Sequence, residues 1–171
     1  MGKSLVKKIL VCVNGTTESI RAAMYAILMA KQFGCALKAV YVVDTATMKF
    51  LLNSRFLAPD EKVLYEKKFR QDGTHYLEYV ESLARVKGIK IDTEMREGSV
   101  CFEIVSVAEK YGADMILVGG KKHKDISDEI RDNPRGSLKA WSTTGNQLMD
   151  FAPCPVLVVN KDDMEAIFKV S

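Results

Sequence analysis

Short apolar runs alternate along this chain with longer segments in which apolar residues recur every three or four positions. Short apolar runs bounded by turn residues are typical of buried strands, and the longer periodic segments are typical of amphipathic helices. The pattern predicts strands at residues 9–13, 37–43, 89–95, 115–118 and 156–159. It predicts helices over residues 17–33, 59–86 and 99–112, with a last helix that begins near residue 142.

Residues that begin and end helices stand where this pattern requires them. Pro59, followed by two acidic residues, marks a helix start, because proline suits the first helical position and acids favour the first turn. Gly34 and Gly112 mark helix ends. Residues 48–52 form an apolar patch, and we expect them to lie in a loop that leads to Pro59.

The regular alternation of strands and helices predicts the fold class. Parallel strands need crossover helices, and these crossovers are right-handed. We therefore expect an α/β fold, with a doubly wound sheet of five mostly parallel strands and helices on both faces, in a single domain. The strand at residues 89–95 is flanked by polar residues, as is typical of a sheet edge.

Composition and charge exclude several classes of protein. The chain has 171 residues, 47% hydrophobic and 27% charged, which suits one globular domain. The net charge of +3 is small and dispersed, so we expect no nucleic acid partner. We find neither a run of membrane-spanning length nor a signal peptide, and so expect no membrane partner and a cytoplasmic location. The four cysteines lack the spacing of a disulfide framework or a zinc site.

Two strand-to-turn junctions, far apart in the sequence, carry the strongest functional signal. Val13 is followed by Asn14-Gly15-Thr16, and Val118 is followed by Gly119-Gly120. In a doubly wound parallel sheet two such strand ends lie side by side where the strand order reverses, and ligands bind there. The pairing predicts a small-molecule site, and a nucleotide is the ligand that we expect.

The segment between the last two predicted strands adds further candidate contacts. Residues 121–141 interrupt the alternation, and we interpret them as an insertion that forms a lid above the crevice. Within it, Lys121 and Lys122 are candidate phosphate contacts. Ser142, Thr143 and Thr144 open the last helix, where free N–H groups and hydroxyls suit an anion. We identify no nucleophile motif or metal-binding cluster, and therefore no catalytic residue.

Taken together, these segments resemble the universal stress protein family, over about residues 8–160. The resemblance rests on residues 9–16, 40–44, 113–119 and 152–159. The last of these, Ala-Pro-Cys-Pro followed by four apolar residues after a βαβ pattern, is the most specific element. The resemblance implies a Rossmann-like fold of the adenine nucleotide alpha hydrolase type, and a domain over residues 1–160 with a C-terminal tail over 161–171.

The resemblance also implies a nucleotide site, from which this chain departs at several positions. Family members that bind ATP hold it between the first and fourth strands, with Gly-x-x-Gly after the fourth strand and Gly-Ser or Gly-Thr before the last helix. Here Gly119 matches the first glycine, and the second falls on Lys122. The closing pair falls on Ser142 and Thr143, after a longer spacer. Asn14 replaces the usual aspartate, and Val42 matches the position that lies against the base.

The last predicted strand indicates how the chain associates. Val156, Leu157, Val158 and Val159 are apolar on both faces, and an uncovered edge of this kind promotes aggregation. The resemblance implies that this strand pairs with its copy in a two-fold homodimer. The alternative is that the tail covers the edge, with Met164, Ile167 and Phe168 as its docking stripe.

These observations lead to three hypotheses about function. The first is a dimeric stress-response module that binds an adenine nucleotide, ATP or AMP, with or without Mg²⁺, and signals to a partner. The second is a nucleotide-free protein-interaction module that meets a protein partner through its lid. The third is a slow ATPase, which the absence of a recognisable general base disfavours.

Overall fold

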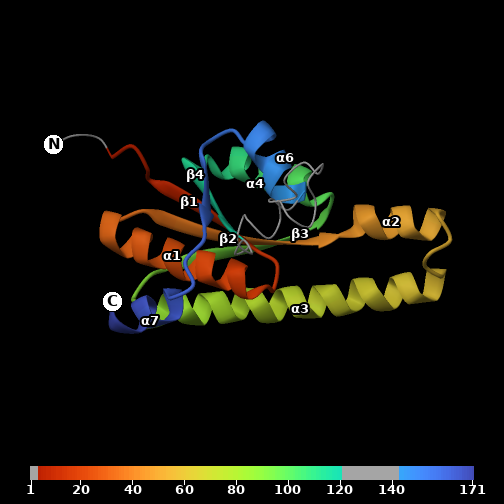
Figure 1. Ribbon diagram of the computed structural model, residues 1–171, viewed down its shortest axis with the longest axis horizontal. Coiled ribbons are helices and arrows are strands. Elements are labelled where there is room, and N and C mark those ends of the chain that lie inside the picture. The colour runs from red at the N-terminus through yellow and green to blue at the C-terminus, as the bar shows by residue number, and fades with distance from the viewer. Residues whose placement is uncertain (1–3, 121–142) are drawn as a thin grey trace, which may run out of the picture.

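A computed structural model describes residues 4–120 and 143–171 of the chain (Figure 1). Its centre is a five-stranded sheet in the order β3-β2-β1-β4-β5, and every pair of neighbouring strands is parallel. The strands are β1 (Lys8–Val13), β2 (Ala36–Asp44), β3 (Ile91–Gly98), β4 (Met115–Gly119) and β5 (Val156–Val159). The predicted doubly wound α/β fold is confirmed.

Helices cover both faces of this sheet (Figure 1). They are α1 (Thr17–Phe33), α2 (Thr45–Asn53), α3 (Pro59–Val86), α4 (Val100–Tyr111), α6 (Thr143–Phe151) and α7 (Met164–Val170). Helices α1, α3 and α7 lie on one face, and α4 and α6 lie on the other. None of the described helices combines the length and the apolarity that crossing a bilayer requires.

Alternation along β1 builds a separate core on each face. Ile9, Val11 and Val13 are buried in the cluster that includes the apolar stripes of α1 and α3. Leu10 points the other way, into the cluster formed with α4 and α6. Because successive strand residues face opposite sides, one apolar run supplies both cores.

Two predicted element boundaries differ from the structure. Residues 45–53, expected as part of a loop, form α2, because Asp44 accepts a hydrogen bond from the Thr47 backbone N–H at 2.9 Å and Met48 is buried beneath the helix. Strand β3 begins at Ile91, later than expected, because the Ile89 N–H still bonds to the Ala84 carbonyl at the end of α3, at 2.9 Å. The predicted position of this strand at a sheet edge is correct.

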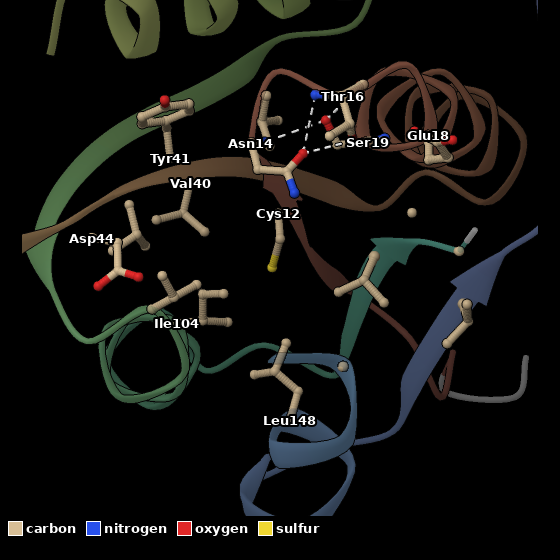
Figure 2. Close-up of a pocket in the computed structure, with 18 of the residues that line it drawn as sticks. Cys12, Asn14, Thr16, Glu18, Ser19, Val40, Tyr41, Asp44, Ile104 and Leu148 are labelled. Carbon is tan, nitrogen blue, oxygen red and sulfur yellow. Dashed lines mark hydrogen bonds between the residues drawn. The ribbon is translucent and has the colours of Figure 1, made fainter. Parts of the chain in front are cut away.

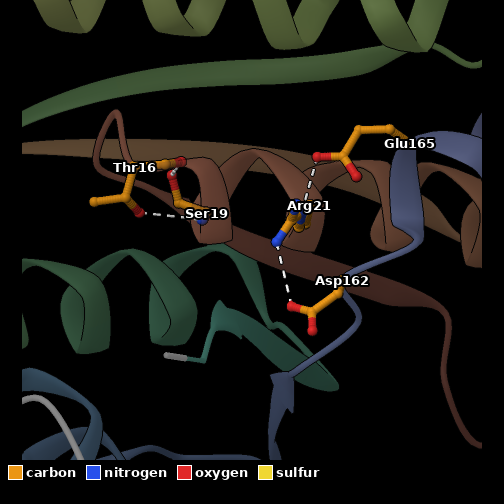
Figure 3. A network of polar contacts seen from close by, with 5 residues as sticks. All are labelled: Thr16, Ser19, Arg21, Asp162 and Glu165. Atoms are coloured by element: carbon orange, nitrogen blue, oxygen red, sulfur yellow. Dashed lines mark hydrogen bonds and ion pairs between the residues drawn. The ribbon is translucent and has the colours of Figure 1, made fainter. Parts of the chain in front are cut away.

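The C-terminal tail forms α7, which packs against α1 (Figure 3). Met164 and Phe168 of the predicted docking stripe are buried, with 1% and 6% of their surface exposed. Arg21 of α1 donates to Glu165 at 2.8 Å and to Asp162 at 3.4 Å. The tail thus joins the core on the α1 face, and β5 has a strand neighbour on one side only in the described part of the chain.

Candidate functional site

A cavity of about 500 Å³ opens at the carboxyl ends of the strands, where β1 and β4 diverge (Figure 2). This is the crevice that the two strand-to-turn junctions predict, because the order of strands reverses between β1 and β4. Five predicted site residues line the cavity: Val13, Asn14, Val42, Val118 and Gly119. The structure therefore brings together residues that are about a hundred positions apart in the chain.

Hydrogen bonds with Thr16 fix the side chain of Asn14 in the lining of this cavity (Figure 2). Its Oδ1 atom accepts from the Thr16 backbone N–H at 3.1 Å and from the Thr16 hydroxyl at 2.7 Å. The Thr16 hydroxyl in turn accepts the Ser19 N–H at 3.2 Å and caps α1. Because Oδ1 points to Thr16, the amide nitrogen of Asn14 is the atom that faces the cavity (Figure 2). Asn14 therefore offers a ligand a donor, where an aspartate would offer an acceptor.

Gly119 owes its place to packing between β4 and α1. A Cβ atom at this position would lie 2.4 Å from the Glu18 carbonyl carbon and 2.6 Å from the Ser19 nitrogen. The strand end and the first turn of α1 thus touch backbone to backbone. At Gly120 a Cβ atom would lie 1.8 Å from Oδ1 of Asn160. Both glycines line the cavity. Backbone packing requires Gly119, whereas the atoms closest to a Cβ at Gly120 belong to the side chains of Asn160 and Val158.

The other predicted contacts have different locations. Gly15, in the left-handed conformation at φ +81°, packs against the ring of Tyr76 and is not among the residues that line the cavity. Thr143 and Thr144 form the first residues of α6. Ser142, Lys121, Lys122 and the rest of the predicted lid lie outside the described residues. Further along α6, Gly145 and Leu148 line the cavity.

Sequence reasoning missed several apolar residues of the cavity lining. Met48 and Leu51 of α2, Phe69 of α3 and Ile104 of α4 supply apolar surface there. The apolar patch at residues 48–52 was the available signal, and its spacing fits one helical face once Asp44 is recognised as an N-cap. Asp44 itself lines the cavity and is half-buried.

The end of β2 presents backbone groups to the cavity. Pairing with β1 stops at Val13 opposite Tyr41, whereas pairing with β3 continues to Asp44 opposite Gly98. The last three residues of β2 therefore have no strand beside them on the β1 side. Backbone groups of this edge, next to Val42, can read the donors and acceptors of a planar ring.

Comparison with known proteins places the chain in a family. Residues 6–160 match the universal stress protein family. The chain belongs to the universal stress protein family. Universal stress protein MJ0531 of Methanocaldococcus jannaschii is 32% identical over 164 residues, which cover 96% of this chain and 88% of that protein.

Solved structures of family members share the fold at low sequence identity. The universal stress protein UspA from Lactobacillus plantarum has a TM-score of 0.67 at 20% identity, covering 92% of this chain and all of that one. A family protein from Arabidopsis thaliana with AMP bound has a TM-score of 0.60 at 15% identity, covering 93% and 94%. A universal stress protein in complex with cAMP has a TM-score of 0.56 at 18% identity, covering 91% and 98%.

The electrostatics of the cavity in this family member come from few groups. Glu18 and Asp44 are the charged side chains that line it within the described residues. Burial among apolar neighbours raises the pKa of the Cys12 thiol to about 12, so this cysteine stays a protonated thiol at neutral pH. Residues 4–120 and 143–171 contain no group of three or more histidine, cysteine, aspartate or glutamate side chains that could hold a metal ion.

Proposed function

We propose that this universal stress protein binds an adenine nucleotide in the cavity at the carboxyl ends of β1 and β4, and signals its occupancy to a partner. The observation that carries the proposal is the cavity itself, which combines apolar walls with a polar end where Asn14, Thr16 and Ser19 lie together (Figure 2). A flat base suits the walls, which include Val42, Ile104 and Leu148. Sugar and phosphate suit the polar end, where Asn14 offers its amide donor.

The family structures with AMP and with cAMP support an adenine nucleotide as the ligand class. Asn14 is the residue at which this site differs from the aspartate that the family usually carries. Asn14 cannot give a metal ion its Oδ1 atom, since Thr16 occupies that atom twice. If Mg²⁺ accompanies the nucleotide, Glu18 of α1 and Asp44 of β2 are the carboxylates that line the cavity among the described residues.

Titration calorimetry with ATP, AMP and cAMP, each with and without Mg²⁺, tests the proposal. We expect saturable binding at micromolar concentrations of at least one of them. Val42→Trp fills the apolar end of the cavity, and we expect it to weaken binding by about tenfold or more, which is about 1.4 kcal/mol. Val6→Trp places the same bulk at a half-buried position before β1, at the opposite end of the sheet, and serves as the matched control. The proposal would be contradicted if no heat of binding were measured up to millimolar nucleotide, or if both variants bound the nucleotide with equal affinity.

A nucleotide-free interaction module is the second candidate, and one observation favours it. The two charged side chains that line the described part of the cavity are both acidic, and they repel phosphate. In that case the protein meets its partner without a ligand, and calorimetry gives no signal with any of the three nucleotides.

We also propose a homodimer through β5. Its residues Val156, Leu157 and Val158 are half-buried, and α7 packs on α1 and not along this edge. Antiparallel pairing of two β5 strands would use the unpaired backbone groups and cover these side chains. Sedimentation of Leu157→Lys beside the unchanged protein measures this contact, and an unaltered mass in the variant would argue against it.

A further inference from the structure

Helix α2 and the first half of α3 extend together beyond the sheet (Figure 1). We call this part, residues 45–70, the arm. Large apolar side chains are unusually exposed on it: Phe50, Phe56, Val63, Leu64 and Tyr65 have between 45% and 80% of their surface accessible. Exposed apolar side chains that cluster on a projection mark interaction surfaces.

The part of α3 within the arm has two distinct faces. Lys62 and Glu66 lie half-buried on the inner face, in line with Gly73 and Leu77, which are buried against the sheet. Leu64 is two residues from both Lys62 and Glu66, and two residues turn a helix by about 200°. Leu64 is therefore at the centre of the outer face, where 67% of its surface is exposed.

Charges on the outer face are segregated around Leu64. Asp60 and Glu61 precede it by four and three residues, and Lys67 and Lys68 follow it by three and four. All four are exposed. Ion pairs within a helix need a spacing of three or four residues, as between Lys62 and Glu66 on the inner face, at 3.3 Å.

The outer acids and lysines are too far apart to pair within one helix. Asp60 and Lys67, like Glu61 and Lys68, are seven residues apart, which is roughly 10 Å along the helix axis. No ion pair joins them to one another in the described structure, and Glu61 instead accepts the Ala58 N–H at 2.8 Å as a capping residue. An acidic turn, the single apolar side chain of Leu64 and a basic turn thus follow one another on one exposed face.

We propose that this face binds a second copy of the chain, with the two α3 helices antiparallel and a two-fold axis at Leu64. An antiparallel copy reverses the order of the three turns, so that the acidic turn of each helix meets the basic turn of the other. Asp60 then comes level with Lys67 of the second copy, within about 1.5 Å along the axis and on the same side of the contact. Glu61 meets Lys68 of the second copy in the same way.

The charge pattern selects a second copy over other occupants. An acidic surface, such as an anionic bilayer, would complement the lysines but repel Asp60 and Glu61. A basic partner would leave the opposite half of the face uncompensated. A two-fold contact pairs both halves at once, because each copy supplies the complement of its own pattern. The arm lies far from β5 across the sheet order, so this contact is separate from the proposed β5 dimer and independent of nucleotide binding.

Sedimentation velocity of the full chain over a range of protein concentrations tests this contact. Lys67→Glu with Lys68→Glu makes all four positions acidic, and Asp60→Lys with Glu61→Lys makes them all basic. We expect each double variant alone to have a lower mass than the unchanged protein, because it loses this contact and keeps any contact through β5. We expect the equimolar mixture of the two variants to regain the higher mass, because every facing pair is then again of opposite sign.

Cross-linking locates the two-fold axis. Leu64→Cys should form a disulfide-linked dimer under mild oxidation, since two copies of residue 64 face each other. Phe102→Cys, on α4 and similarly exposed at 70%, should not exceed the background of the four native cysteines. Charge variants with the same mass as the unchanged protein, or an equimolar mixture no heavier than either variant alone, would overturn the proposal.

Discussion

Replacing Gly119 separates a role in packing from a role in ligand binding. In Gly119→Ala the added Cβ would lie 2.4–2.6 Å from backbone atoms of Glu18 and Ser19, where ordinary contact begins at 3.4 Å. The start of α1 and the end of β4 must therefore move apart by about 1 Å. Overpacking of this kind costs about 1–3 kcal/mol, and we expect the upper half because backbone atoms cannot rotate away.

Urea unfolding, followed by circular dichroism, measures this cost. A loss of about 2–3 kcal/mol corresponds to a fall in Tm of roughly 4–12 °C for a chain of this size. Gly34→Ala is the control, because it has nothing within 4 Å and its cost comes only from the left-handed backbone, at φ +68°. One result would refute the packing argument: a free energy of unfolding for Gly119→Ala within about 0.5 kcal/mol of that of the unchanged protein, together with loss of nucleotide binding. The glycine would then be required by the ligand.

Two further predictions concern stability. The backbone N–H groups of Lys7 and Lys8 donate to Asp114 at 2.8 and 2.9 Å and hold the pKa of that carboxyl below its usual range. This contribution is present above the ordinary aspartate pKa and is lost as the pH falls through the lowered one. Asp114→Asn should therefore be less stable than the unchanged protein in urea at neutral pH, with a difference that shrinks in acid; a constant difference would contradict this. Met164→Ala should cost about 2–5 kcal/mol in the same assay, because Met164 of α7 is 1% exposed. Val170→Ala, at 88% exposure, should stay within about 0.5 kcal/mol, and equal effects would show that α7 does not dock as described.

The candidate site shows how far a motif predicts the role of its residues. The two strand ends were predictable as one site, because a doubly wound sheet brings them together. The role of Gly119 was not, because a glycine beside a ligand and a glycine beside a helix backbone look the same in a sequence. Whether Asn14 offers a donor or an acceptor to the cavity likewise depends on Thr16. Its two hydrogen bonds hold Oδ1 and leave the amide nitrogen toward the cavity.

The sequence alone determined the order and type of most elements, the doubly wound sheet and the crevice between β1 and β4. These follow from local periodicity and from the short list of ways in which parallel strands can be connected. The tertiary structure decided which surfaces meet: α7 on α1, α2 as a wall of the cavity, and an arm whose outer face is left bare. Such contacts join residues far apart in the chain and depend on the shape and charge of both partners, so no local pattern specifies them.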